Sequence, residues 1–496
     1  MKGLRSQTIR GAGWSTIEGA ISQGLAFLVF LFMARLLSPT DFGLVALANL
    51  YIMVAQYVIF CGLGPAVVQS EEFDEENLDT AFWLQMAIGA GFFGLTLGLP
   101  AMIAKFFGTL SLTPIVAALS PIFIFSALSS MQNAVLARKL DFRSLAIRTL
   151  GTSVLSGAIG VALALRGYGV WSLVWQQLSA GLIQVILLWR ISPWRPRFRF
   201  SRDKASRLVR FGMHAMAADL ANLVSRRSGQ YFVGKFLGPI PSGFFAIAAR
   251  VSNLISEVII RSLARVTLAS FSRLQEERGR FAAAFYRVIG MQSLLVLPAS
   301  IGLALLVPEV IIVLFGAKWL PAAPAMQLLL LGSIFEALSA VNVSALSSQG
   351  RPDWGNYLTL IHLSANLTAF AFAVRWGLEA VALANVIRAA VLYPVELLVL
   401  RRLLGISPWR AVLQVLPLLI ITIGMAALVY GIQHAVGHAW PAAATLALCT
   451  CAGACFFSGA LYLVQRPLFM ELLGCLQVFR QRGARSEEVV PAATVS

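Results

Sequence analysis

The sequence predicts an all-α polytopic membrane protein with fourteen transmembrane helices. Hydrophobic residues make up 58% of the chain and charged residues 12%, whereas soluble domains carry about 45–50% apolar and about 25% charged residues. The apolar residues gather in long stretches, and most Lys and Arg residues lie between them. A helix needs about 20 apolar residues to cross a bilayer, so 496 residues provide many spans and leave little for a soluble domain.

Fourteen stretches bounded by charged residues or by Gly and Pro are long enough to cross the membrane. They run over 13–34, 43–66, 80–104, 111–136, 145–165, 168–189, 211–234, 241–266, 283–307, 322–347, 355–374, 378–400, 411–435 and 441–465. The first stretch is too long for the apolar core of a cleaved signal peptide, and more spans follow it.

The positive charges predict the orientation. If the N-terminus is cytoplasmic, 27 of the 39 Lys and Arg residues fall on the cytoplasmic side, 6 on the opposite side and 6 inside spans. The positive-inside rule then places both termini in the cytoplasm. The net charge of +17 is spread over short loops. We therefore assign it to topology and lipid headgroups and expect no nucleic-acid partner.

An internal repeat relates spans one to six to spans seven to twelve. Five residues of the first copy recur 200 positions later: Leu37, Pro39, Gly43, Ala46 and Ala48, as Leu237, Pro239, Gly243, Ala246 and Ala248. The predicted parts are an N-lobe at 1–194, a basic cytoplasmic linker at 195–210, a C-lobe at 211–404, spans thirteen and fourteen at 405–466, and a disordered cytoplasmic tail at 467–496. Two copies with the same orientation suit a transporter whose lobes rock about a central cavity.

Charged residues inside spans indicate where that cavity lies. An ionisable side chain at the bilayer centre costs about 2.5–3.5 kcal/mol by insertion scales, so it normally faces a partner or water. In span eight, Arg250, Glu257, Arg261 and Arg265 follow at steps of 7, 4 and 4 residues, which keeps all four directions within about 80° on a helix. This spacing predicts one polar face turned toward water.

Spans seven and twelve carry similar faces. The polar residues of the two spans are Asp219, Asn222, Arg226 and Gln230, flanked by Arg227, in span seven, and Asn385, Arg388 and Glu396 in span twelve. Guanidinium groups form charge-assisted, often bidentate bonds to phosphate. The predicted substrate-binding residues, for a diphosphate, are therefore Arg226, Arg227, Arg250, Arg261 and Arg388.

A structural alternative remains open for these charges. Glu257 can pair with Arg261 one turn away, Asp219 can pair with an arginine opposite, and Arg265 can extend to the cytoplasmic interface.

Carboxylates in a membrane cavity can also carry protons or cations. The candidates for ion coupling are Glu18, Asp219, Glu257 and Glu336, and a structural hydrogen bond is the alternative for each. The sequence contains no nucleotide-binding Gly-rich loop and no metal-binding helix motif. We therefore expect a transporter and not an enzyme, with no cofactor, no metal site and no catalytic residue.

Several motifs resemble one known family. They are Gly11-Ala12-x-Trp14-Ser15, the run from Ala34 to Gly43, Gly62-Leu63-Gly64 with Val67-Val68-Gln69, the run from Leu136 to Phe142, and Pro308-Glu309 with the run from Leu314 to Trp319. In these motifs, the chain resembles the polysaccharide transporter family of the MOP superfamily, the Wzx-type flippases. Within that family, the motifs are most similar to the colanic-acid and exopolysaccharide exporter branch.

The resemblance implies two six-helix lobes in a V plus two C-terminal helices. It also implies a cargo, an undecaprenyl-diphosphate-linked oligosaccharide moved from the cytoplasmic to the periplasmic leaflet of the inner membrane for exopolysaccharide or lipopolysaccharide synthesis. Membrane lipids are expected partners, and a polysaccharide polymerase and its co-polymerase are further candidates. A lipid II flippase and a multidrug or cation antiporter of the same superfamily are the alternatives. The excess of arginine argues against the antiporter.

Overall fold

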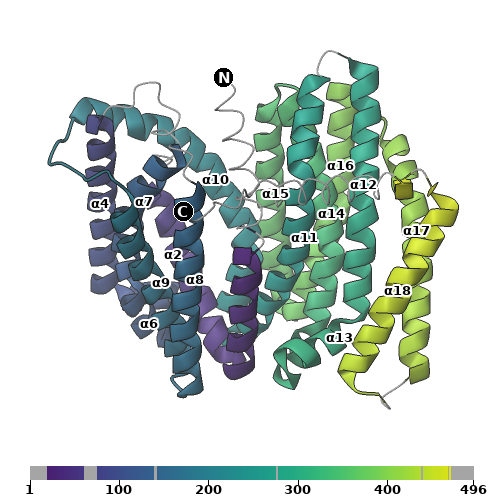
Figure 1. Cartoon of the computed structure of the whole chain (residues 1–496), viewed down its shortest axis with the longest axis horizontal. Helices are drawn as coiled ribbons and strands as arrows, with labels where there is room; N and C mark the ends of the chain where they lie inside the picture. Colours follow the sequence, from purple (N-terminus) through teal and green to yellow (C-terminus); the bar gives the residue numbers. More distant parts are fainter. Residues whose placement is uncertain are drawn as a thin grey trace, which may run out of the picture. The chain divides into compact units, whose positions relative to one another are not determined.

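The computed structural model describes residues 21–60, 75–138, 142–274, 277–436 and 440–466, together with Gly19 and 468–470. Within these ranges the secondary structure is helical and contains no strand (Figure 1). The all-α class predicted from the sequence is therefore confirmed.

The described residues form a succession of helices. The α-helices are Ile21–Leu36, α2 (Pro39–Phe60), α4 (Glu75–Gly98), α5 (Pro100–Phe106), α6 (Thr113–Leu119), α7 (Pro121–Arg138), α8 (Phe142–Leu165), α9 (Val170–Ile191), α10 (Arg202–Leu237), α11 (Pro239–Arg273), α12 (Arg278–Leu305), α13 (Val307–Val310), α14 (Ala323–Ser348), α15 (Pro352–Ala373), α16 (Leu378–Leu404), α17 (Pro408–Val436) and α18 (Ala442–Val464). Shorter 3-10 turns cover Leu110–Leu112, Ala317–Ala322 and Val374–Trp376, and a π-helical turn covers Ile311–Phe315.

Proline sets several helix starts. Pro39, Pro121, Pro239, Pro352 and Pro408 are each the first residue of a helix, where the missing N–H costs no hydrogen bond. The predicted span 111–136 is interrupted for this reason: a 3-10 turn leads into α6, and α7 begins anew at Pro121. The span itself is present, because Leu110–Arg138 is among the segments long and apolar enough to cross a bilayer.

The chain is a multi-pass membrane protein. Eleven helices in the described ranges are long and apolar enough to cross a bilayer. α10 and α11, with 36 and 35 residues, are long enough but are not among the eleven, and Ile21–Leu36 is shorter. These three segments correspond to predicted spans one, seven and eight. The exact number of fourteen therefore stays a prediction.

The helices divide into two compact units. Unit 1 comprises Met1–Arg250, Leu314–Ala325 and Asn356–Arg388, and unit 2 comprises Val251–Val313, Met326–Gly355 and Ala389–Ser496. In unit 1, buried apolar residues of α2, α5, α6, α7 and α9 form one core. In unit 2, α12 and α18 both pack against α17.

The internal repeat is visible in the backbone. Pro100 and Gly108 recur 208 positions later as Pro308 and Gly316, and Gly108 and Gly316 have φ angles of 72° and 96°, values that favour glycine. Each glycine follows a short helix that begins with or contains an aligned proline, Pro100 or Pro308. The two copies therefore turn at corresponding points.

Candidate functional site

One face of α10 carries exposed polar side chains. Asp219, Asn222 and Arg226 are exposed, and their steps of 3 and 4 residues place them on the same side of the helix. α10 starts at the cap Ser201, whose hydroxyl oxygen accepts a hydrogen bond from the Lys204 N–H at 3.4 Å. Arg227, beside this face, is half-buried. That this face turns toward water stays a prediction.

Gln230 does not belong to this exposed face. Its side-chain amide donates to the carbonyl oxygen of Ser242 at 3.0 Å and to the Ser242 hydroxyl at 2.6 Å, and both residues are buried. The exposed face therefore ends where α10 packs against the first turns of α11. The prediction that Gln230 continues it was wrong.

Arg388 lies in a buried polar network on α15 and α16. Its guanidinium contacts Nδ1 of His362 at 2.8 Å and donates to the side-chain oxygen of Asn385 at 2.9 Å. One turn beyond His362, the amide of Asn366 donates to the carbonyl oxygen of Ser225 at 3.1 Å and to its hydroxyl at 2.8 Å. His362 and Asn385 thus hold the Arg388 guanidinium. Helix α15, which carries His362, also contacts Ser225, the residue before Arg226.

The other predicted residues are placed as follows. Arg250 and Glu257 are half-buried on α11, and Glu336 is exposed on α14. Arg261 lies within α11, but its side chain falls outside the described part of the chain, and so does all of Glu18. The proposed pairing of Glu257 with Arg261 therefore stays a prediction.

Glu396 is a carboxylate that the sequence placed on the span-twelve face, yet it is 1% exposed. Its two oxygens accept hydrogen bonds from the Ser339 hydroxyl at 2.7 Å and from the Asn342 amide at 2.8 Å. A buried carboxylate needs such donors, and this arrangement ties α16 to α14 within unit 2.

Two repeated glycines form a reciprocal contact within unit 1. A Cβ atom added to Gly43 would lie 1.8 Å from the Pro239 carbonyl oxygen, and one added to Gly243 would lie 2.0 Å from the Pro39 carbonyl oxygen. Real Cβ contacts below 3.0 Å essentially never occur. The starts of α2 and α11 therefore approach so closely that both positions require glycine, and each copy of the repeat contacts its counterpart.

Trp319 reinforces this contact. Its indole N–H donates to the Ala34 carbonyl oxygen at 2.9 Å, and its ring makes edge-on contacts with Phe42 and Phe244, with centroids 5.5 and 6.0 Å away. Next to it, the Lys318 ammonium donates to the Arg35 carbonyl oxygen at 2.7 Å. The motif from Leu314 to Trp319 thus joins both glycine-containing segments.

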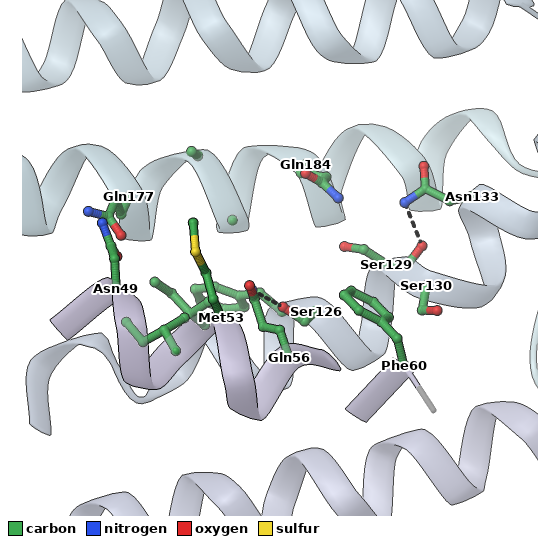
Figure 2. A pocket seen from close by; sticks show the side chains of 15 residues that line it. Asn49, Met53, Gln56, Phe60, Ser126, Ser129, Ser130, Asn133, Gln177 and Gln184 are labelled. Carbon is green, nitrogen blue, oxygen red and sulfur yellow. Dashed lines mark hydrogen bonds between the residues drawn. The ribbon is translucent and has the colours of Figure 1, made fainter. Parts of the chain in front are cut away.

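A cavity of about 450 Å³ lies between α2, α7 and α9 of unit 1 (Figure 2). Its polar lining consists of Asn and Gln amides and Ser hydroxyls, among them Asn49, Gln56 and Gln177. None of the charged residues predicted from the sequence to bind substrate or ions lines this cavity. The signal that could have revealed it was the spacing of uncharged polar residues seven apart.

The comparisons with known proteins are decisive for the family. The family described as "Polysaccharide biosynthesis protein" matches residues 32–324, more than half of the chain. The chain belongs to this family. The resemblance inferred from the motifs is thereby confirmed.

Relatives in the polysaccharide biosynthesis family extend over most of the chain. The succinoglycan biosynthesis transport protein ExoT of Rhizobium meliloti (strain 1021) is 27% identical over 485 residues, covering 96% of this chain and 97% of that protein. The lipopolysaccharide biosynthesis protein WzxC of Escherichia coli (strain K12) is 23% identical over 360 residues, covering 71% and 72%.

Solved structures show the same fold. The lipid II flippase MurJ in an inward closed conformation superposes with a TM-score of 0.75 at 15% identity, covering 92% of this chain and 99% of MurJ. An inward-facing multidrug transporter of the MATE family, in the MOP superfamily, reaches a TM-score of 0.63 at 16% identity, covering 79% and 98%. At these identities the likeness concerns the fold alone.

Proposed function

We propose that the protein is a flippase that moves undecaprenyl-diphosphate-linked oligosaccharide from the cytoplasmic to the periplasmic leaflet of the inner membrane. The exposed polar face of α10 in a membrane protein of the polysaccharide biosynthesis family carries this proposal. A helix that displays Asp219, Asn222 and Arg226 is costly against lipid tails and stable against water. The names of ExoT and WzxC, which assign transport or lipopolysaccharide biosynthesis to those proteins, support the cargo class.

Arginine supplies the binding chemistry for the diphosphate. Arg226 is exposed, and Arg227 and Arg250 are half-buried, so their guanidinium groups can donate to phosphate oxygens. Arg388 already donates to Asn385, and we assign it to orienting α15 and α16. Arg261 completes the proposed set through its position on the same helix face as Arg250.

The proposed topology has fourteen spans, arranged as two six-helix lobes plus α17 and α18, with both termini in the cytoplasm. Ile21–Leu36, α10 and α11 would be the three spans beyond the eleven apolar helices. Charge on α10 and α11 lowers their hydropathy, as expected for helices that line a polar cavity.

We propose transport by alternating access. The predicted orientation puts the loops around Pro39 and Pro239 on the periplasmic side. The reciprocal contact of Gly43 with Gly243, together with the Trp319 hydrogen bond to Ala34, would then close that side. Outward opening has to break these contacts and allow the cargo to leave.

A proton or sodium gradient is the proposed driving force, with Asp219 as the leading coupling group because it shares the exposed face with Arg226. Glu18, Glu257 and Glu336 are the other candidates. The proposed partners are membrane lipids and, for the next step of synthesis, a polysaccharide polymerase with its co-polymerase.

The family match favours polysaccharide precursors over lipid II, which shares the undecaprenyl diphosphate. The multidrug alternative is less suited to the chain, because a cationic drug needs carboxylates and arginines outnumber carboxylates on the polar faces of α10, α11 and α16.

Reconstituted vesicles test the proposal. The probe is the lipid-linked repeat unit extracted from cells of the source that lack the polymerase, and its transfer between leaflets is measured. Replacing Arg226 by Gln should slow transfer about 10- to 150-fold, because a hydrogen bond to a charged group contributes about 1.5–3 kcal/mol. Arg166→Gln, in an exposed loop after α8, is the matched control.

Two results would contradict the proposal in different ways. Vesicles with the unaltered protein that transfer no lipid-linked repeat unit would show that the chain is not such a flippase. Full transfer by the Arg226→Gln, Arg250→Gln double variant would keep the flippase and remove the arginine site.

A further inference from the structure

The cavity between α2, α7 and α9 has the size of a ligand site and an uncharged lining. Ligand pockets usually enclose about 300–1,000 Å³, and this cavity encloses about 450 Å³. None of the 15 residues that line it is Asp, Glu, Lys, Arg or His. All three helices belong to unit 1, so the cavity is built within one compact unit.

The polar lining follows one rule of spacing. Each of the three helices contributes two residues seven positions apart: Asn49 and Gln56 on α2, Ser126 and Asn133 on α7, and Gln177 and Gln184 on α9. Seven residues turn an α-helix by about 700° and advance it by about 10.5 Å. Each pair therefore shares a face two turns apart, and together the pairs form a polar strip along the cavity (Figure 2).

Part of this strip is bonded within the protein. The Gln56 amide donates to the Ser126 hydroxyl at 2.9 Å, and the Asn133 amide donates to the Ser129 carbonyl oxygen at 3.0 Å. At the same end, the Arg148 guanidinium donates to the Asn133 side-chain oxygen. These bonds fix the orientation of two amides that face the cavity.

The remaining amides are available to a ligand. Asn49, Gln177 and Gln184 are half-buried, and their side chains have no hydrogen-bond partner among the residues that the structure describes. Figure 2 shows Asn49 and Gln177 among the side chains that line one end of the cavity. Polar side chains in membrane helices often serve to join helices, as Gln56 does with Ser126. The side chains of Asn49, Gln177 and Gln184 do not join helices in this way.

Amides and hydroxyls match the chemistry of sugars. A sugar hydroxyl both donates and accepts, and each Asn or Gln side chain offers two donors and one acceptor oxygen. A diphosphate would lack a cation in this lining, and a cationic drug would lack an anion. The rings of Phe60 and Phe125 add apolar surface for the C–H face of a sugar ring.

We propose that this cavity binds the uncharged sugar part of the cargo, apart from the arginines that bind its diphosphate. The inference rests on the proposed function and deepens it, because it assigns the oligosaccharide to a site of its own. The amides on α2, α7 and α9 would then recognise the oligosaccharide of the cargo.

A comparison of two lipid ligands distinguishes the sugar site from the diphosphate site. Affinities of the purified protein are measured for the lipid-linked repeat unit from polymerase-deficient cells and for undecaprenyl diphosphate without sugar. Gln177→Met and Gln184→Met should each weaken binding of the sugar-bearing lipid about fivefold, as expected for the loss of one hydrogen bond, with no change for the sugarless lipid. Ala180→Leu, which fills the cavity from α9, should have the same selective effect.

Gln176→Met is the matched control, because Gln176 is the neighbouring glutamine on α9 and does not line the cavity. Unchanged affinity for the sugarless lipid also shows that each variant is folded. Equal affinities of Gln176→Met, Gln177→Met, Gln184→Met and Ala180→Leu for the sugar-bearing lipid would overturn the sugar site and leave the flippase intact. Failure of the unaltered protein to bind either lipid would overturn the proposed function and the sugar site with it.

Discussion

The contact between Gly43 and Gly243 makes a sharp prediction about the conformational equilibrium. A methyl group at residue 43 would have to move from 1.8 Å to at least 3.0 Å from the Pro239 carbonyl oxygen, so the two segments must separate by about 1.2 Å or more. Forcing extra atoms into a packed contact costs about 1–3 kcal/mol. Gly43→Ala should therefore disfavour the closed contact by about 5- to 150-fold.

Helix propensity acts in the opposite direction, because alanine stabilises an isolated helix by about 1 kcal/mol relative to glycine. Any loss of the closed form must then come from the tertiary contact. Gly243→Ala should act in the same way, since its Cβ would lie 2.0 Å from the Pro39 carbonyl oxygen. The double variant should show much less than the sum of both effects, because both change one contact.

The assay is the reactivity of a cysteine at Ser242, which is fully buried, toward a maleimide that cannot cross the membrane. The five native cysteines are replaced by alanine first. Ser242→Cys should be protected alone and reactive from the periplasm when combined with Gly43→Ala. Gly94→Ala, on α4 with no atom within 4 Å of the added methyl group, should leave it protected. Protection in the Gly43→Ala background, with normal transport, would refute the closing role of this contact.

Three further predictions follow from other contacts. Trp319→Phe leaves an aromatic ring at this buried position and removes the 2.9 Å hydrogen bond to Ala34, which contributes about 1 kcal/mol. Ser242→Cys should become at least about fivefold more reactive, and unaltered reactivity would show that this bond does not hold the closed form. Glu396→Leu leaves the buried donors of Ser339 and Asn342 without their acceptor, which costs about 2–4 kcal/mol of stability. The midpoint of thermal unfolding in detergent should therefore fall clearly for Glu396→Leu and less for Glu396→Gln. Equal midpoints for the unaltered protein and both variants would contradict this reasoning. Asp219→Asn removes an exposed carboxylate from α10 and should flatten the dependence of transport on a proton or sodium gradient, whereas an unchanged dependence would exclude Asp219 as the coupling group.

Much of the fold could be predicted because membrane insertion constrains each helix separately. An apolar stretch of about 20 residues crosses regardless of its neighbours, and the described part of the chain contains eleven such helices. At Pro121 a new helix begins although the apolar stretch continues through it. Proline removes a backbone donor without lowering hydrophobicity, so hydropathy alone does not reveal the interruption.

The site was harder to predict because its residues depend on neighbours. Spacing on α10 identified the face with Asp219 and Arg226, which is a property of one helix. It did not show that Gln230 would donate to Ser242 or that Arg388 would meet His362, since those contacts depend on which helices cross. The repeat identified Gly43 and Gly243 as equivalent, but their mutual contact depends on how α2 and α11 pack in the tertiary structure.

α2 connects the closing contact with the proposed sugar site. It carries Gly43 near its start and Asn49 and Gln56 in the cavity lining, and Gly43 and Asn49 are about 9 Å apart along the helix axis. A ligand shifts a conformational equilibrium by as much as its affinities for the two states differ. Sugar held by Asn49 can therefore promote opening at Gly43 through the displacement of one continuous helix, provided that the cavity binds sugar more tightly when the glycines are apart.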